Sequence, residues 1–241
     1  MGKRSGLQAI ILAGGKGARL LPYTMVLPKP LMPIKDKPIL EVVIRQLKHR
    51  GFTDICIATG HLGELIAAFF KDGSRLGVNI RYSIEDAPLG TAGPIRLAAP
   101  LADNFLVMNG DLLTTLDYRE LFEFHLRHGA AATIACCRRE VAIDYGTLEI
   151  GKDGALRGYV EKPRIGYTVS MGINVLSRRA AEPLPRGKPM DIPELMMKLV
   201  ERGERVLCHA PHCVWLDIGR VDDYRKAVEI YERREQEFIP S

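Results

Sequence analysis

The chain has 241 residues, 46% of them apolar, and carries 34 lysines and arginines against 29 acidic residues. This length and apolar content suffice for one large α/β domain or two small ones. The net charge of +5 includes no long Lys/Arg run of the kind that binds nucleic acid, and no stretch of 18 apolar residues could cross a membrane. Five scattered cysteines are typical of a reducing compartment. We therefore expect a cytoplasmic protein whose partners include neither nucleic acid nor a membrane.

Short apolar runs alternate with amphipathic segments over the first half of the chain. Leu40, Val43, Ile44 and Leu47, for example, recur at the three- and four-residue spacing of a helix, which Gly51 would end. The alternation indicates a mainly parallel sheet with helices on both faces. The pattern predicts strands over residues 9–12, 55–58, 78–83, 105–108 and 131–136, and helices over residues 38–50, 62–70, 92–98 and 118–127.

The pattern changes after about residue 140. Asp153 and Gly154 form a favourable turn pair between residues 146–150 and 155–160, which predicts a β-hairpin. No linker or internal repeat divides the chain, so we expect one compact domain whose second half builds onto the sheet of the first. Further strands are predicted over residues 172–176 and 205–209, and helices over residues 192–200 and from residue 221 onward.

The last predicted helix has an apolar stripe. Val221, Tyr224, Val228 and Tyr231 share one side of it, and charged residues occupy the rest. Such a stripe packs on a surface, either the protein's own core or a second copy of the chain. A homo-oligomer is therefore left open.

The most informative segment is residues 12–34, LAGGKGARLLPYTMVLPKPLMPI, which follows the first predicted strand. A P-loop needs Ser or Thr after Gly-Lys, and here a glycine follows instead. A dinucleotide-binding fingerprint needs a further glycine where Leu20 stands. What remains is a glycine turn at the carboxyl edge of the sheet, where open α/β sheets bind ligands. Arg19 offers a rigid fork of donors for a phosphate, and Lys29 offers a point charge.

The segment resembles the opening motif of the sugar-1-phosphate nucleotidyltransferases through the string Gly15-x-Gly17-x-Arg19-x-x-Pro22-x-Thr24-x4-Lys29-Pro30. This family transfers a nucleotidyl group from an NTP to a sugar 1-phosphate and releases pyrophosphate. The resemblance implies these two substrates, a Rossmann-like mixed, mainly parallel sheet, and one nucleotidyltransferase domain over residues 1–241 without a C-terminal β-helix domain. It also implies that the nucleotide is bound by Leu12, Ala13, Gly14, Gly15, Gly17, Glu85, Pro88, Gly90, Thr91, Asn109 and Gly110.

Nucleotidyl transfer needs a divalent cation to neutralise the triphosphate, and Mg²⁺ takes carboxylate and water oxygens as ligands. Two aspartates follow apolar runs at expected strand ends, Asp111 in VMNGDLL and Asp217 in VWLDIG. Both resemble the two metal-binding aspartates of the family in order and context. We therefore expect Mg²⁺ as the cofactor, held by Asp111 and Asp217.

The sugar phosphate is expected at the segment YVEKP. Pro163 favours extended backbone before it and has no N–H, so a strand should end at Lys162, whose side chain could point into the cleft above the sheet. The segment resembles the family's EKP motif, which implies that Lys162 holds the sugar phosphate and Glu161 binds sugar hydroxyls. Gly146, in DYGTLEI, resembles the glycine whose backbone approaches the sugar.

One position departs from the family pattern. Many members have an asparagine just before the strand predicted here over residues 172–176. In this chain Ser170 or Met171 stands in that place. We assign Ser170 to the sugar site and leave Met171 as the alternative.

Base selection is expected in residues 84–95, IEDAPLGTAGPI, where a glycine-flanked turn opens a helix and Thr91 can hydrogen-bond a base edge. Guanine presents two adjacent donors that the carboxylate of Glu85 or Asp86 can accept together, whereas uracil and thymine present two acceptors around one N–H. The string PLGTAGP also resembles mannose-1-phosphate guanylyltransferases. Both features favour GTP with a mannose- or heptose-like sugar phosphate. UTP or dTTP with glucose 1-phosphate or a related sugar phosphate stays open as an alternative.

The resemblance implies a single displacement in which the sugar phosphate attacks the α-phosphorus of the NTP. Arg19 and Lys29 would stabilise the triphosphate and the leaving pyrophosphate, and Asp111 and Lys162 complete the catalytic set. Such catalysis is positioning plus electrostatics and needs no covalent nucleophile. The rival interpretation is a non-catalytic regulatory subunit that binds a nucleotide sugar; the joint presence of these residues and Asp217 speaks against it.

Overall fold

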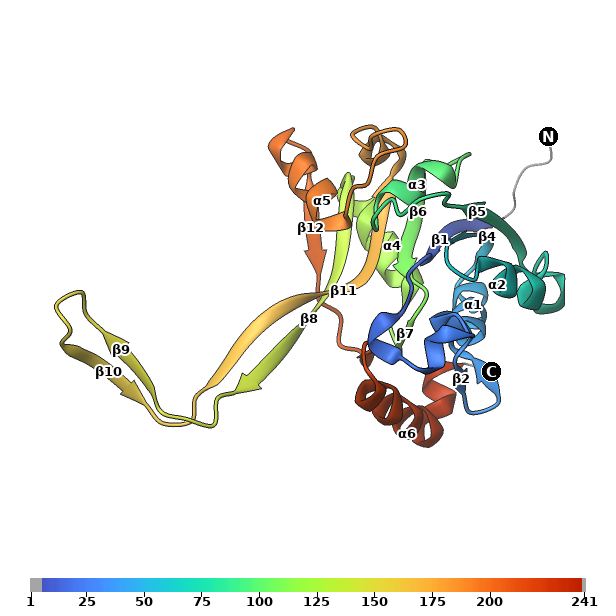
Figure 1. The fold of residues 1–241 in the computed structure, drawn as a ribbon. Helices are drawn as coiled ribbons and strands as arrows, with labels where there is room; N and C mark the ends of the chain where they lie inside the picture. Colours follow the sequence, from blue (N-terminus) through green and yellow to red (C-terminus); the bar gives the residue numbers. More distant parts are fainter. Residues whose placement is uncertain (1–5, 240–241) are drawn as a thin grey trace.

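A seven-stranded sheet forms the centre of the computed structural model, which describes residues 6–239 (Figure 1). The strand order is β12-β8-β11-β6-β1-β4-β5. β11 runs antiparallel to both of its neighbours, β6 and β8, while the other pairs of the sheet are parallel. The predicted mixed, mainly parallel α/β sheet is therefore confirmed. The strands are β1 (Leu7–Ala13), β4 (Phe52–Thr59), β5 (Asn79–Ile84), β6 (Asn104–Asn109), β8 (Ala132–Ala142), β11 (Arg164–Ser177) and β12 (Val206–His209).

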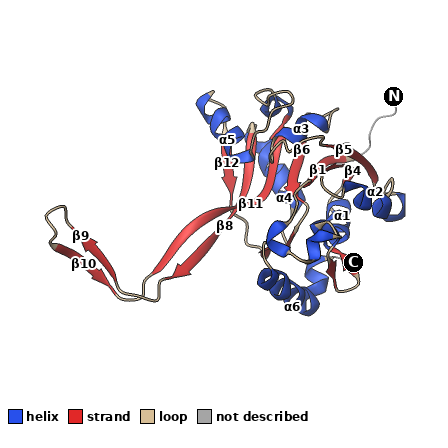
Figure 2. Ribbon diagram, viewed as in Figure 1, coloured by secondary structure: helices blue, strands red, loops and turns tan. Residues whose placement is uncertain are grey.

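Helices cover both faces of this sheet, as predicted (Figure 2). In the central strand β1, Ile10 and Ile11 are fully buried and point to opposite faces. Ile11 packs in one cluster with residues of α1, α2 and α4, and Ile10 packs in another with residues of α3 and α5. Among residues 6–239 no helix has the length and hydropathy needed to cross a bilayer. The helices are α1 (Ile39–His49), α2 (Gly63–Phe70), α3 (Gly93–Leu97), α4 (Tyr118–His128), α5 (Ile192–Glu201) and α6 (Val221–Phe238).

Helix α6 holds the opening loop in place. Its Tyr231 is fully buried in a third apolar cluster that includes Leu20 and Ile34, and the hydroxyl of Tyr224 donates to the carbonyl of Pro33 over 2.5 Å. The apolar stripe of the last helix therefore packs on the protein's own core. Four short strands brace the same region: β2 (Pro33–Ile34), β3 (Lys37–Pro38), β7 (Leu112–Thr114) and β13 (Trp215–Asp217).

Strands β8 and β11 continue beyond the sheet as a two-stranded arm, residues 138–169, whose tip carries β9 (Thr147–Ile150) and β10 (Leu156–Val160) (Figures 1 and 2). The predicted hairpin around Asp153 and Gly154 is confirmed. The expectation of a compact chain is wrong for this arm, which projects away from the body and is largely exposed. Turn chemistry determines that the two strands pair, but where a hairpin packs depends on contacts with distant parts of the chain.

Candidate active site

The spacing of the opening motif follows from three residues that meet in space. Gly17 has a left-handed backbone (φ 62°), and a Cβ there would come within 2.8 Å of the Thr24 side chain and 3.5 Å of Cβ of Lys29. The Thr24 hydroxyl donates to the carbonyl of Gly17 over 2.9 Å, and Thr24 is buried. Position 17 requires glycine because its backbone is left-handed and because a side chain there would collide with Thr24. The loop is therefore folded back on itself so that Lys29 returns to the end of β1.

The loops that follow β1, β4 and β5 also meet. A Cβ on Gly14 would lie 2.6 Å from Oε1 of Glu85, and a Cβ on Gly60 would lie 2.9 Å from the carbonyl of Gly14. Gly15, in contrast, has open space where its Cβ would stand. The backbone of Gly15 can therefore be approached by a ligand without steric hindrance.

Lys29 and Asp111 form an ion pair across the cleft, with 2.5 Å between Nζ and Oδ2. Lys29 is nearly buried, with 8% of its surface exposed. Lys29 follows β1 in the chain, and Asp111 follows β6, the parallel neighbour of β1. Parallel strands end at the same edge of a sheet, which explains why these distant residues meet there.

The second predicted metal ligand lies beside the first. Asp217 ends β13 and is paired in register with Leu112, the residue after Asp111. The partial loss of solvent around Asp217 raises its pKa, and the nearby charge of Asp111 adds to the shift, while the charges of Lys29 and Arg19 oppose it. A position at which two carboxylates disfavour each other's charge is suited to a divalent cation.

The donor set fits Mg²⁺. It consists of two carboxylates, because among the described residues no three or more His, Cys, Asp or Glu side chains lie together as a metal site. Mg²⁺ is commonly bound through one or two carboxylates, with waters and substrate phosphate oxygens as its other ligands. Asp111 and Asp217 could supply the carboxylates. A Cβ on Gly219 would lie 3.5 Å from Oδ2 of Asp217 and 3.6 Å from Nη1 of Arg19, which places that guanidinium at the same point.

Two adjoining hollows, of about 250 and 660 Å³, lie at the carboxyl edge of the sheet and share Leu12, Gly15 and Asp111. The smaller one is cationic because Arg19 and Lys29 line it. The larger one has the size of a small-molecule site. The smaller hollow is also lined by Ala13, Gly17, Ala18, Leu20, Pro30 and Gly219. The larger is also lined by Gly14, Lys16, Gly60, His61, Glu85, Asp86, Ala87, Pro88, Gly90, Thr91, Pro94 and Asn109.

The predicted base-binding residues line the larger hollow, but their side chains already have protein partners. Oε2 of Glu85 accepts a hydrogen bond from the Leu89 N–H over 2.9 Å, and burial raises the pKa of Glu85 in spite of that bond. The hydroxyl of Thr91 donates to Oδ1 of Asp191 over 3.1 Å and accepts from the Ile192 N–H over 2.8 Å. Thr91 therefore keeps only one acceptor lone pair for a ligand.

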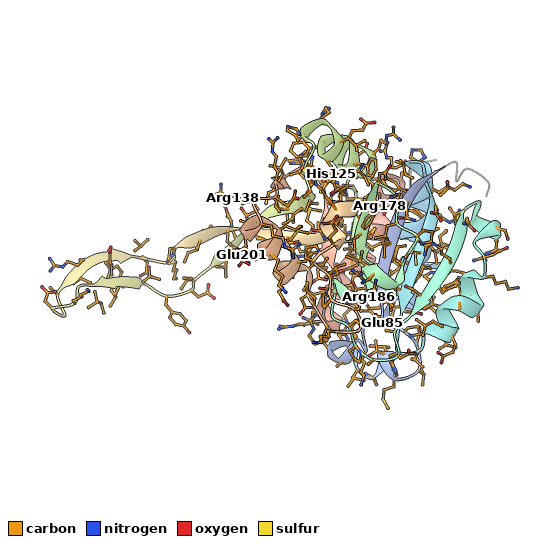
Figure 3. All side chains as sticks on the ribbon, turned by 90° about the horizontal axis from the view of Figure 1, so that it is seen from above. Glu85, His125, Arg138, Arg178, Arg186 and Glu201 are labelled. Atoms are coloured by element: carbon orange, nitrogen blue, oxygen red, sulfur yellow. The ribbon has the colours of Figure 1, made fainter. Side chains whose placement is uncertain are left out.

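The predicted sugar-binding residues of the arm are not brought to this cleft. Glu161 and Lys162 are exposed, and neither they nor Gly146 line either hollow. Gly146 directly precedes β9 and Glu161 directly follows β10, and both strands lie out on the arm, away from the body (Figure 1). Figure 3 shows Arg138 where the arm leaves the body, while Glu85 lies within the body. The expectation that Lys162 points into the cleft above its own sheet is therefore wrong for this structure. The strand before Lys162, β10, ends at Val160 as expected, but it ends on the arm and not at the cleft.

The structure distinguishes the two candidates for the position in which many relatives have asparagine. Met171 is fully buried in the core and cannot contact a ligand. Ser170 is exposed at the root of the arm, and its hydroxyl accepts from the Gly172 N–H over 3.3 Å. A Cβ on Gly172 would lie 2.7 Å from the Asn109 side chain. Of the two candidates, only Ser170 has a side chain that a ligand could reach.

Some site residues were missed by the sequence reasoning. Lys16 and His61 line the larger hollow beside the expected Asp86, and Asp191 braces Thr91 from outside it. His61 follows Gly60 at the end of β4, so the rule that ligands bind at the carboxyl ends of parallel strands could have found it. Asp191 lies 100 residues from Thr91, and no sequence pattern links the two. Gly110 was assigned to nucleotide binding, and here its N–H donates to the Leu12 carbonyl over 2.9 Å.

Known proteins resemble the chain over most of its length. A sequence model of the nucleotidyl transferase family matches residues 8–234. A UTP–glucose-1-phosphate uridylyltransferase of Synechocystis is 33% identical over 242 residues, and this match covers 92% of the chain. A mannose-1-phosphate guanyltransferase of Saccharomyces cerevisiae is 30% identical over 234 residues, and this match covers 93% of the chain. The crystal structure of HddC from Yersinia pseudotuberculosis complexed with GMP-PN has a TM-score of 0.72 at 29% identity and covers 93% of this chain and 99% of its own. A Bacillus anthracis protein, 24% identical, shows the same fold with a TM-score of 0.74 over 93% of this chain and 94% of its own.

The fold and the cleft at the carboxyl edge of its sheet define an α/β nucleotide-binding protein. The chain belongs to the sugar-1-phosphate nucleotidyltransferase family. It spans 62% and 64% of the length of the two curated relatives just named.

Proposed function

We propose that the protein transfers a nucleotidyl group from an NTP, GTP in the first place, to a mannose- or heptose-like sugar 1-phosphate and releases pyrophosphate. The observation that carries the proposal is the pair of hollows that meet at Asp111. One is lined by Arg19 and Lys29 and suits the phosphates. The other is lined by Glu85, Gly90 and their neighbours and suits a nucleoside.

The reaction follows from this arrangement. An anionic oxygen of the sugar phosphate forms a bond to the α-phosphorus, and the bond from that phosphorus to the oxygen that joins the α- and β-phosphates breaks, so that pyrophosphate leaves with that oxygen. Mg²⁺, when bound by Asp111 and Asp217, supplies charge neutralisation of the triphosphate. Lys29 and Arg19 stabilise the negative charge that develops on the leaving pyrophosphate. The nucleophile is already deprotonated, so the chain needs no general base.

The choice of GTP rests on Glu85. Its carboxylate lies in the larger hollow and can accept from the two adjacent donors of guanine, N1–H and the exocyclic amine. A guanyltransferase among the relatives and a neighbour complexed with GMP-PN support this choice, and a uridylyltransferase relative keeps UTP as the alternative. For UTP the partner would be glucose 1-phosphate or a related sugar phosphate.

Pyrophosphate release tests the proposal directly. The purified chain is incubated with Mg²⁺ and each combination of GTP, UTP, dTTP, ATP or CTP with mannose, heptose or glucose 1-phosphate. We expect GTP with one of the first two sugars to give the highest kcat/KM. Highest turnover with UTP or dTTP would overturn the base assignment, and no turnover with any pair would overturn the enzymatic role.

A second candidate function has one observation in its favour. Glu161 and Lys162 line neither of the two hollows of their own chain, as could be the case in a regulatory subunit that binds a nucleotide sugar without reacting. The same panel separates the two. Binding of a nucleotide sugar without pyrophosphate release from any pair would favour the regulatory subunit.

A further inference from the structure

The polar residues Tyr159, Glu161 and Lys162 of the arm lie together beside Gly146. A Cβ on Gly146 would lie 2.9 Å from Oε2 of Glu161 and would collide with the hydroxyl of Tyr159. That hydroxyl donates to the same Glu161 oxygen over 3.3 Å. Next to them Lys162 is exposed and has a left-handed backbone (φ 46°), which is uncommon for a residue with a side chain. Strained residues of this kind cluster at functional sites.

The arm holds these residues away from the two hollows of its own chain. The β8–β11 ladder runs unbroken from Arg164 opposite Ala142 to Ser170 opposite Cys136. β11 comes near the larger hollow at Gly172, which lies beside Asn109, one of the residues lining it. Lys162 is ten residues farther along, which in extended strand is about 30 Å. The register shifts only beyond Ser170, at the root of the arm.

The arm also exposes apolar surface that water disfavours. Of the twenty large apolar side chains that are exposed in residues 6–239, nine lie between Val141 and Tyr167. Tyr145 is 79% exposed, and Ile150 and Leu156 are each 62% exposed. A two-stranded hairpin is marginally stable alone in water, and apolar patches of this kind mark interaction surfaces.

A second apolar patch lies in the opening loop, close to the cleft. Leu21, Tyr23, Met25 and Val26 are between 51% and 78% exposed. They stand in the chain between Arg19 and Lys29, both of which line the smaller hollow. A partner that covered this patch would therefore contact the same loop that supplies Arg19 and Lys29 to the smaller hollow.

We propose that the arm of one copy lies across the cleft of a second copy, where its Glu161 and Lys162 bind the sugar 1-phosphate. The inference rests on the proposed function. The occupant is a second copy because the arm carries the segment that resembles the family's sugar-phosphate motif, while Asp111 and Arg19 line a hollow in the body of the same chain. Reciprocal exchange of two arms gives a closed two-fold dimer in which each site is built from two chains.

Mixed dimers test the exchange. Chains with Asp111→Asn and chains with Lys162→Ala are co-expressed with different tags and purified through both tags. One site of each such dimer then combines an intact Asp111 with an intact Lys162 from the other chain. We expect pyrophosphate release at about half of the wild-type rate per dimer, although each variant alone is inactive.

The matched control reverses the arrangement. A wild-type chain is paired with a chain that carries both substitutions, so that every site lacks one group if the arm acts on the partner. We expect this dimer to be inactive. If the arm serves its own chain, the control dimer keeps half the activity and the first dimer has none, which overturns the proposal. Failure to recover any particle with both tags overturns it as well.

A physical measurement keeps the test independent of activity. Light scattering should give twice the 26.8 kDa chain mass, and the variant Tyr145→Ser/Ile150→Ser/Leu156→Ser should be a monomer with the body still folded. Hydrogen exchange at residues 147–160 should accelerate in that variant. A wild-type monomer at micromolar concentration, or a dimer that survives these substitutions, would refute the arm exchange even if the wild-type chain transfers nucleotidyl groups. Absence of turnover in a dimer held by its arms would instead count against the proposed function.

Discussion

Nζ of Lys29 lies 2.5 Å from Oδ2 of Asp111, and the two side chains differ in solvent access, with 9% of the lysine and 29% of the aspartate exposed. The lysine has lost most of its water and depends on the carboxylate for compensation. The aspartate is open to the cleft and can take a second partner. Asp111, which we expect to hold Mg²⁺, therefore also positions the ammonium group of Lys29 beside the expected triphosphate.

Asp111→Asn should abolish turnover and leave the fold intact. Asparagine keeps an oxygen that can accept from Lys29, but its neutral amide is a poor ligand for Mg²⁺. We expect no measurable pyrophosphate release, an unchanged circular dichroism spectrum, and loss of the thermal stabilisation that Mg²⁺ with GTP gives the wild-type chain. Near wild-type turnover in this variant would refute the metal assignment.

Lys29→Met separates the role of the cation from that of the metal ligand. Methionine fills the volume of the lysine stem but carries no charge, so kcat should fall by about 10²–10³-fold, the usual cost of losing one donor to a developing charge. Mg²⁺ binding should persist because Asp111 and Asp217 are unchanged. Steady-state kinetics and Mg²⁺ titration of the variant check both statements; a change in KM for the NTP alone would assign Lys29 to uniform binding instead.

Glu85→Gln should reduce the preference for GTP. Glutamine can accept only one of the two guanine donors and brings a donor of its own, so kcat/KM for GTP should fall by about 10- to 100-fold, as expected for a lost hydrogen bond to a charged group. Turnover with UTP should change little. The wild-type preference should also weaken as the pH falls toward the raised pKa of Glu85, because protonation removes the acceptor.

Asp86→Asn is the matched control, because Asp86 lines the same hollow. It should leave the ratio of GTP to UTP turnover near the wild-type value. If the ratio collapses in Asp86→Asn and not in Glu85→Gln, the guanine-reading carboxylate is Asp86.

The core of the site could be predicted because short-range rules determine it. A buried parallel strand ends in a glycine turn, and Gly17, Thr24 and Lys29 are held at fixed spacing by contacts within one loop. Asp111 follows the strand that pairs with β1, so it had to lie at the same edge of the sheet. Each step uses neighbours in sequence or adjacent strands.

What could not be predicted depends on distant contacts. The Asp153-Gly154 turn determines that residues 146–160 form a hairpin, and it gives no information on what the hairpin packs against. The sequence places Lys162 at the end of a strand in either case. Nor does any local signal indicate that Asp191 contacts Thr91, because that contact follows from the way α5 approaches the loop after β5.

Asp191→Ala should weaken nucleotide binding although Asp191 does not line the hollow. Oδ1 of Asp191 accepts from both the N–H and the hydroxyl of Thr91. Losing both bonds, at about 1 kcal/mol each, should raise KM for the NTP by about 30-fold and leave kcat nearly unchanged. Asp191→Asn keeps the acceptor oxygen and should restore a near wild-type KM. The side chain makes no capping bond to α5, so equal loss in both variants would refute the bracing role.

His125 gives the protein a pH-dependent stability that is separate from catalysis. It is 1% exposed on α4, with Nδ1 2.9 Å from the Thr133 hydroxyl and Nε2 3.1 Å from Oδ1 of Asn104. Because the amide oxygen can only accept, Nε2 carries the proton and Nδ1 accepts from Thr133. Burial, and then the charge of Arg179, lowers the pKa of His125 to about 4.

The unfolded chain, in which the histidine has a pKa of about 6.5, takes up a proton more readily than the native chain does. The contribution of His125 to the free energy of unfolding is therefore complete above pH 6.5, and it is lost as the pH falls toward 4. Between pH 7 and pH 4.5 the loss should amount to about 2–3 kcal/mol of unfolding free energy. Urea unfolding of the wild-type chain and of His125→Gln at both values isolates this share, because the variant keeps every other titrating group. The wild-type chain should lose more stability than the variant by that amount; equal losses would mean that His125 is protonated in the native state or accessible to water.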